Sequence, residues 1–396
     1  MLALTLFGIF FVIALAGVPL LYAILVTTVG VIWAHGMTHP LETIFLSFIG
    51  GVEPFILLAV PLFIFAGELL AQGGVGKRIV EFARVLFGWL PGGLGVVTVV
   101  SCTLFGGVSG SAIADTAAIG SLVIPAMVAR GYSRGFAAAL LAVAGTLALL
   151  MPLSIPFLIY AFISGVSMRT LSMAGLLPAL ASALALIAVC MWHGRKSGCD
   201  NGDERSTPAQ IWAATRDAGP ALLMPLIIIG GIWTGVFTPS ESAAVAVMLV
   251  IGATGAMAWL ITVEQVAVQM ATWIQIVATE PWMFLLLFNI CLLLLGIFIE
   301  PLPAMLLSAP LFLPLAKHFE MDMVHIGVVM TANLAIALYT PPVGGTLFVA
   351  AKLARAGIGE ITQALWPLMA ATFTVVLLVT YFPQLSLWLP RFIQSH

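Results

Sequence analysis

A short polar run interrupts the long apolar stretch SCTLFGGVSGSAIADTAAIGSLVIP (101–125). Its members are Ser109, Gly110 and Ser111, and Asp115 follows shortly after them. Hydroxyl, carbonyl and carboxylate oxygens are hard ligands that suit Na⁺. A carboxylate inside an apolar segment is energetically unfavourable and marks a functional site. The stretch therefore predicts a cation site. The alternative is that Asp115 caps a helix by accepting hydrogen bonds from free N–H groups.

Three further apolar stretches combine proline or glycine with polar residues. They are GTLALLMPLSIP (145–156), LLGIFIEP (294–301) and NLAIALYTPPVGG (333–345). Proline removes a backbone donor and frees an upstream carbonyl, and the N-terminus of a half-helix attracts a carboxylate. These breaks predict binding of Na⁺ and of an anionic substrate, whereas the alternative is that they are only packing kinks. The candidate residues are Gly145, Pro152, Ser154, Gly296, Glu300, Asn333, Thr340, Pro341 and Gly344.

The composition defines the environment of these residues. Of the 396 residues, 62% are hydrophobic and only 8% are charged, against about 25% charged in an average soluble domain. So few charges cannot cover a soluble globule, which excludes a soluble enzyme and a disordered chain. The net charge of -2 leaves no basic surplus for nucleic acid. The composition therefore predicts a polytopic membrane protein in a lipid bilayer. Its apolar runs are continuous and not alternating, which predicts an all-α fold, and the length allows roughly ten to twelve spans.

The apolar runs predict two repeats on either side of a polar linker. The first repeat, 1–194, contains scaffold helices, an interfacial arm helix at 76–90, a re-entrant hairpin at 93–128 and a broken helix at 135–166. The linker, 195–218, is predicted to be cytoplasmic because it carries four basic residues. The second repeat, 219–396, contains a hairpin at 283–316, a broken helix at 324–352 and a C-terminal span at 362–389.

Proline spacing supports the repeat. Pro125, Pro152 and Pro178 recur as Pro314, Pro341 and Pro367, each 189 residues later. Repeats with corresponding broken helices are typical of secondary transporters, whose substrate site lies at the repeat interface. A membrane-embedded enzyme is a remote alternative, because the sequence has no cluster of acids, histidines or cysteines near one face. The four cysteines form no CxxC pair, and no metal other than Na⁺ is predicted.

Several motifs resemble the large membrane subunit of tripartite ATP-independent periplasmic (TRAP) transporters over nearly the whole chain. They include SGSAIADTAAIGSLVIPAM (109–127), SIPFLIYAFISGVSM (154–168) and NLAIALYTPPVGGTLFVA (333–350). The resemblance implies an elevator-type, Na⁺-coupled importer of an organic acid such as a C4-dicarboxylate, a sialic acid or a sugar acid. It also implies a bacterial inner-membrane location, a small four-helix membrane subunit and a periplasmic substrate-binding protein as partners, and no organic cofactor.

The resemblance further implies two Na⁺ sites. One would combine Ser109, Gly110 and Ser111 with the break at 145–154. The other would combine the tip at 294–301 with Thr340, Pro341 and Gly344.

The sequence departs from the family pattern in three places. Leu149, Met151 and Leu153 stand where the family has Gly-Pro and a double proline, and Leu302 and Pro303 follow the second tip. Between TVEQVAVQ and EPWMFL the family has one more span, whereas here only residues 270–279 intervene. The number of crossings would then place both hairpins on the same side of the membrane. The alternative function is therefore a degenerate or non-transporting paralogue that lacks one span.

Overall fold

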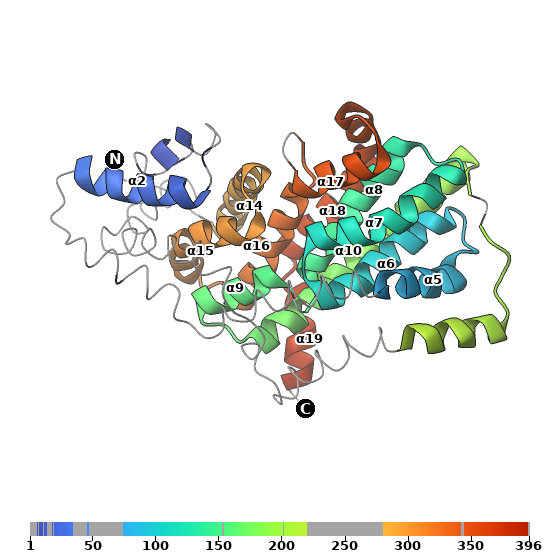
Figure 1. Ribbon diagram of the computed structural model, residues 1–396. Helices are drawn as coiled ribbons and strands as arrows, with labels where there is room; N and C mark the ends of the chain where they lie inside the picture. Colours follow the sequence, from blue (N-terminus) through green and yellow to red (C-terminus); the bar gives the residue numbers. More distant parts are fainter. Residues whose placement is uncertain are drawn as a thin grey trace.

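The computed structural model describes residues 20–34, 74–152, 154–200, 202–219, 280–341 and 344–394, and a few isolated positions before residue 50. The regular structure in these residues is entirely helical (Figure 1). The sequence also predicts apolar runs at 55–72 and 219–261. Residues 55–72 and 220–261, and the place of the missing span at 270–279, lie outside the described residues. The elements are α2 (Leu20–Ala34), α5 (Val75–Phe87), α6 (Gly93–Ser109), α7 (Ala112–Ala129), α8 (Arg134–Gly145), η2 (Thr146–Leu150), α9 (Ile155–Ser164), α10 (Met168–Ser197), α14 (Pro281–Phe298), α15 (Pro301–His318), α16 (Met323–Ala337), α17 (Gly345–Ala354), α18 (Ile358–Tyr381) and α19 (Gln384–Gln394).

Within the described residues, four helical stretches are long and apolar enough to cross a bilayer. They are Ala112–Ala129, Arg134–Ser164, Met168–Ser197 and Ile358–Tyr381. Five apolar helices are shorter, and they include most of α6, α14, α16 and α17. A helix of ten to seventeen residues is shorter than the roughly 20 residues that span the hydrocarbon core. Four of these short helices lie in the predicted hairpins and broken helices, and the fifth, Tyr22–Trp33, lies in α2.

Two residues separate α6 from α7. Gly110 ends α6 with φ 60°, in the left-handed region that glycine adopts without strain. Ser111 then begins α7 as its N-cap, with its hydroxyl accepting from the Ala114 N–H at 3.4 Å. The two helices pack against each other, so residues 93–129 form a helical hairpin whose tip is residues 109–111.

The predicted broken helix of the first half is interrupted at residues 151–154. The 3₁₀ turn η2 follows α8 directly, and Met151 is extended (φ -75°, ψ 156°) because it precedes Pro152. Ser154 then caps α9 by accepting from the Phe157 N–H at 3.3 Å. The second half has the same order, in which α16 ends at Ala337 and α17 begins after the N-cap Gly344.

Two sequence predictions need correction, namely a break of the second hairpin at Glu300, Pro301 and Pro303, and a single C-terminal span. The second hairpin breaks at Ile299–Glu300, and Pro301 and Pro303 lie in the first turn of α15, where missing N–H groups are tolerated. The predicted C-terminal span 362–389 is two helices, because α18 ends at Tyr381 and α19 begins at Gln384. Pro383 disfavours helical backbone at Phe382, which explains the end of α18.

The two halves interlock (Figure 1). Residues of α8 and α16 are buried almost throughout, so these two helices form the centre of the fold. Hairpin helix α7 packs against α17 of the second half, and hairpin helix α15 packs against α9 of the first. Two further contacts also join helices of different halves, since α8 packs against α18 and α16 packs against α10. Each hairpin therefore lies against the broken helix of the opposite half.

Candidate functional site

The first hairpin tip gathers the polar residues that the sequence singled out. Ser109 and Asp115 are fully buried, and the Ser109 hydroxyl donates to Oδ1 of Asp115. The Ser111 N–H donates to Oγ of Ser109 at 3.2 Å. Oδ2 of Asp115 is buried and accepts no hydrogen bond from the described residues. The cap of α7 is Ser111, so the prediction that Asp115 caps this helix is wrong.

Close packing brings the 3₁₀ turn η2 to this carboxylate. A Cβ atom added at Gly106 would lie 2.7 Å from Cα of Ala148 and 2.9 Å from Oδ2 of Asp115. A Cβ atom at Gly145 would overlap Oγ1 of Thr116. Both glycines are therefore needed for the close approach of the broken helix to the hairpin. Gly145 was predicted from the sequence, whereas Gly106 was not.

Residues of the second half reach the same tip. Ala112, at the start of α7, forms a small buried cluster with Leu149 of η2 and with Ala335 and Leu338. A Cβ atom at Gly345 would contact the side chain of Ile113 at 3.5 Å. The first tip, the first break and the second break thus meet at one place. Leu149 is one of the departures from the family pattern, and here it packs in this apolar cluster.

Pro152 and Ser154 have structural partners at the first break. The Pro152 carbonyl accepts from the Ser172 hydroxyl at 2.6 Å. Ser154 is buried, and its Oγ is the α9 cap described above. The N-terminus of α9 therefore begins inside the protein at the break.

The second tip differs chemically from the first. Glu300 is exposed, and its side chain makes no cap hydrogen bond to the described part of α15. Gly296 lies about one turn before the break at Ile299–Glu300, and an added Cβ atom there would lie 2.5 Å from Cβ of Ala337 and 3.1 Å from Cδ2 of Leu334. Gly296 thus holds α14 close to α16, but the structure does not bring Glu300 into contact with the other predicted residues in the described parts of the chain.

At the second break, Thr340 and Pro341 are half-buried. Oγ1 of Thr340 donates to the Ile336 carbonyl at 2.8 Å. The chain turns back tightly, since a Cβ atom at Gly344 would lie 2.9 Å from Cα of Tyr339. The Leu338 carbonyl accepts from the Thr346 N–H at 3.2 Å and from the Thr346 hydroxyl at 3.1 Å.

Asn333 lies in a buried polar network that the sequence did not predict. Its Nδ2 donates to Oδ1 of Asn289 at 2.5 Å and to the Val329 carbonyl at 2.8 Å. Asn289 also exchanges hydrogen bonds of 3.3 Å with Thr380, so the network joins α14, α16 and α18. Oδ1 of Asn333 has no partner among the described residues. The spacing of Asn289 and Thr380, far apart in sequence, gave no signal of this contact.

The network predicts a stability effect for Asn333→Ala. The truncation leaves Asn289 and the Val329 carbonyl with fewer partners, and unsatisfied buried groups cost about 1–3 kcal/mol each. We expect a lower unfolding temperature in detergent, and Asn289→Ala should give a similar fall. Because both residues belong to one network, the double variant should be less destabilised than the two losses combined. Additive losses would contradict the network.

Comparison with known proteins identifies relatives of the whole chain. The family model for the DctM component of tripartite ATP-independent periplasmic transporters matches residues 7–250 and 243–385. The C4-dicarboxylate TRAP transporter large permease protein DctM of Rhodobacter capsulatus is 34% identical over 438 residues, which cover 98% of this chain and 99% of that protein.

Two further relatives are named for different substrates. The sialic acid TRAP transporter large permease protein SiaM of Vibrio cholerae is 34% identical, covering 87% of this chain and 88% of its own length. The isethionate TRAP transporter permease protein DctMQ of Oleidesulfovibrio alaskensis is 34% identical over 97% of this chain but only 65% of its own length. The similarity thus extends across proteins that differ in substrate.

Proposed function

The chain belongs to the family of DctM components of tripartite ATP-independent periplasmic transporters, and from this premise we propose that it couples Na⁺ entry to the import of an organic acid. As a member of this family it is a multi-pass membrane protein and a transporter permease. The observation that carries the proposal is the buried Asp115 carboxylate at a hairpin tip, whose Oδ2 accepts no hydrogen bond from the described residues. An uncompensated buried charge is strongly unfavourable, so a cation there would stabilise the site.

Na⁺ fits the groups around this carboxylate as a transported ion. Oδ2 of Asp115 lies close to Gly106, where an added Cβ atom would be 2.9 Å from this oxygen and 2.7 Å from Cα of Ala148 in η2. Carboxylate, hydroxyl and carbonyl oxygens are the ligands that broken helices offer to Na⁺. We assign the first ion to residues 109–115 with the 145–154 break. The second break, with Thr340, Pro341 and Gly344, would hold an ion through neutral oxygens.

The proposal includes two structural repeats that move as an elevator. Each half has a hairpin followed by a broken helix and one long helix, in the same order. Gly106 faces Ala148 in the first half, and Gly296 faces Ala337 in the second. Each hairpin also packs against the broken helix of the other half, α7 against α17 and α15 against α9. These correspondences support a duplicated unit in which the hairpins and broken helices carry the ion and the substrate.

The substrate class and the partners follow from the family. The relatives' names include a C4-dicarboxylate, sialic acid and isethionate, all of which are anions at neutral pH. The buried N-terminus of α9 at the first break suits such an anion. We propose a periplasmic binding protein and a small membrane subunit as partners in a bacterial inner membrane.

Direct ion binding tests the proposal. The purified chain in detergent should bind ²²Na⁺ saturably, and NaCl should raise its unfolding temperature relative to choline chloride at equal ionic strength, since a ligand of the native state stabilises it. Equal stabilisation by both salts, with no saturable ²²Na⁺ binding, would overturn Na⁺ coupling. Succinate, sialic acid and isethionate, tested on the partner binding protein, would then define the substrate.

A non-transporting paralogue is the second candidate. It is favoured by the short interval at 270–279, where the family has one more span. The family model also matches this chain in two separate segments, which overlap at residues 243–250, shortly before that interval. Liposomes containing the chain, its small subunit and its binding protein would decide between the two. Substrate accumulation driven by an inward Na⁺ gradient would exclude the paralogue, whereas Na⁺ binding without uptake would support it.

Thr340→Ala tests the second break. The hydroxyl donates its proton to Ile336, so its lone pairs remain available to an ion. We expect the Na⁺ concentration for half-maximal ²²Na⁺ binding to rise about fivefold, which corresponds to about 1 kcal/mol for one neutral ligand. Thr362→Ala is the matched control, because the exposed Thr362 makes the same 2.8 Å bond to the carbonyl four residues earlier. A lower unfolding temperature with unchanged affinity would assign Thr340 to packing.

A further inference from the structure

The polar segment after α10 is attached to the first hairpin through Asp200. Its side chain is 1% exposed, although the segment was predicted as a linker. Oδ2 of Asp200 accepts from the Leu94 N–H at 2.7 Å and from the Tyr132 hydroxyl at 3.1 Å. Its carbonyl accepts from the Gly92 N–H at 3.0 Å. Asp200 therefore caps the N-terminus of α6, where free N–H groups and the helix dipole favour a carboxylate.

The same residue binds the other helix of the hairpin. Arg130 ends α7, and its Nη1 donates to Oδ1 of Asp200 at 2.9 Å. Its Nη2 donates to Oδ1 of Asp203 at 2.6 Å. Partial burial acts to lower the pKa of Arg130, but the hydrogen bonds to the two aspartates outweigh it and raise the pKa. At the end of the hairpin opposite the tip, both α6 and α7 are thus bound to the segment that contains Asp200 and Asp203.

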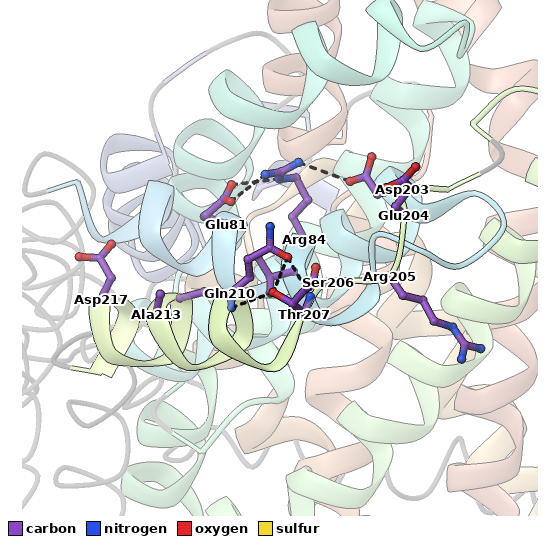
Figure 2. Close-up of a pocket in the computed structure, with 12 residues that line it drawn as sticks. Glu81, Arg84, Asp203, Glu204, Arg205, Ser206, Thr207, Gln210, Ala213 and Asp217 are labelled. Atoms are coloured by element: carbon purple, nitrogen blue, oxygen red, sulfur yellow. Dashed lines mark hydrogen bonds and ion pairs between the residues drawn. The ribbon is translucent and has the colours of Figure 1, made fainter.

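A second arginine extends the contact to α5 (Figure 2). Arg84 lies between Glu81 and Asp203, with Nη2 2.8 Å from Oε1 of Glu81 and Nη1 3.4 Å from Oδ2 of Asp203. The hydrogen bonds from Arg84 hold the pKa of the Glu81 carboxyl below its usual value. These residues line an open pocket of about 640 Å³ between α5 and residues 203–217. Solvent screening makes the two ion pairs of Arg84 weaker than the buried contacts of Asp200.

The backbone at Asp200 indicates that the side chain is required there. Its φ of 56° lies in the left-handed region, which glycine adopts with less strain than aspartate. Glycine at this position would lose the contacts to Leu94, Arg130 and Tyr132. The contacts of the Asp200 carboxylate with these three donors therefore offset the strain of its left-handed backbone.

The contact lies at the opposite end of the hairpin from the ion site. The 17 residues of α6 extend for about 25 Å, and a continuous helix transmits a change of position at one end to the other. At the tip, Gly106 and Gly145 allow almost no clearance against Ala148 and Thr116. A small change in the splay of α6 and α7 would therefore separate Ser109 and Asp115 from η2.

We propose that Asp200, held by Arg130 and Tyr132, is a positioning residue that fixes the open end of the first hairpin and thereby preorganises its tip for the ion. The ion-binding part of this inference rests on the proposed function, whereas the effect on the tip itself does not.

Asp200→Asn is the sharpest test, because asparagine tolerates the left-handed backbone. Asparagine keeps only one acceptor oxygen, so its NH₂ group must face either the Leu94 N–H or the Arg130 guanidinium, which are both donors. In the full-length protein we expect faster hydrogen exchange of residues 106–116 without Na⁺, and a rise in the ²²Na⁺ dissociation constant of about threefold to tenfold. Arg130→Gln should behave alike, and the double variant should add little to either change. Glu204→Gln, an exposed acid on the same segment, is the control and should change neither measurement.

The outcomes separate this inference from the proposed function. Unchanged exchange at residues 106–116 in a folded Asp200→Asn protein would overturn the positioning role, whether or not Na⁺ binds. If exchange at residues 106–116 is faster in Asp200→Asn but the wild-type protein does not bind ²²Na⁺, the positioning role is supported and Na⁺ coupling is overturned. If Asp200→Asn fails to fold, Tyr132→Phe removes only one hydroxyl, and it should increase exchange at the tip to a smaller extent. No change at the tip in Tyr132→Phe and Arg130→Gln would also overturn the inference.

Discussion

Asp115→Asn is expected to weaken ²²Na⁺ binding about 100-fold, which corresponds to about 3 kcal/mol for removing one member of a buried ion pair. Asparagine keeps the shape of the side chain, and its Oδ1 can still accept from Ser109. The ion, however, loses the only formal negative charge among the predicted ligands of the first site. Na⁺-driven uptake should be abolished or strongly reduced for the same reason.

The same substitution should affect stability in the opposite direction. Without Na⁺, the buried carboxylate is uncompensated, and its neutral replacement should unfold at the same temperature as the wild-type protein or higher. The stabilisation by NaCl over choline chloride should disappear. An Asp115→Asn protein that retains wild-type Na⁺ affinity would remove this residue from the site. Glu204→Gln, which changes an exposed charge, should leave both measurements as in the wild type.

The second large effect is expected from Gly106→Ala. The new Cβ atom would lie 2.7 Å from Cα of Ala148 and 2.8 Å from its Cβ, so η2 or α6 must shift. Overpacking of this kind costs about 1–3 kcal/mol, and the shift moves the break away from Asp115. We therefore expect both a lower unfolding temperature and at least tenfold weaker ²²Na⁺ binding, because 1.4 kcal/mol corresponds to a factor of ten.

Two variants make the Gly106 result specific. Gly359→Ala introduces the same methyl group in α18, where no described neighbour lies within 4 Å; it should be neutral or stabilising by up to about 1 kcal/mol. Ala148→Gly, added to Gly106→Ala, removes the opposing Cβ atom and should restore part of the Na⁺ affinity. If Gly106→Ala behaves like Gly359→Ala, the close approach of η2 to the hairpin is not needed.

The sequence identified the breaks because proline and glycine act locally. Pro152 disfavours helical backbone at the residue before it, and Gly110 provides the left-handed residue that the tip needs. The positions of both hairpins and of both broken helices could therefore be predicted to within a few residues. The same local reasoning failed at the end of α18, where the sequence stays apolar beyond Pro383 and hydropathy alone predicts one continuous span.

The contacts between distant residues could not be predicted. Asp200 lies in a charged stretch that looks like a solvated linker, yet its carboxylate is buried because the fold brings three donors to it. Asn289 and Thr380 are single polar residues in apolar helices, and their pairing depends on how α14 and α18 are placed. Glu300 shows the converse, since an acid beside an apolar hairpin is exposed at the tip.

The exchanged packing of the two halves has a consequence for biogenesis. Helix α7 lies against α17, and α9 lies against α15, so the first half is synthesised long before the surfaces that cover it. At about 5–20 residues per second, α7 waits at least roughly 10 s for α17 to leave the ribosome. During that time the nascent hairpin must stay inserted without its partner. A chain truncated after the polar segment should therefore be recognised as unfinished and degraded, and supplying the second half as a separate polypeptide should rescue it.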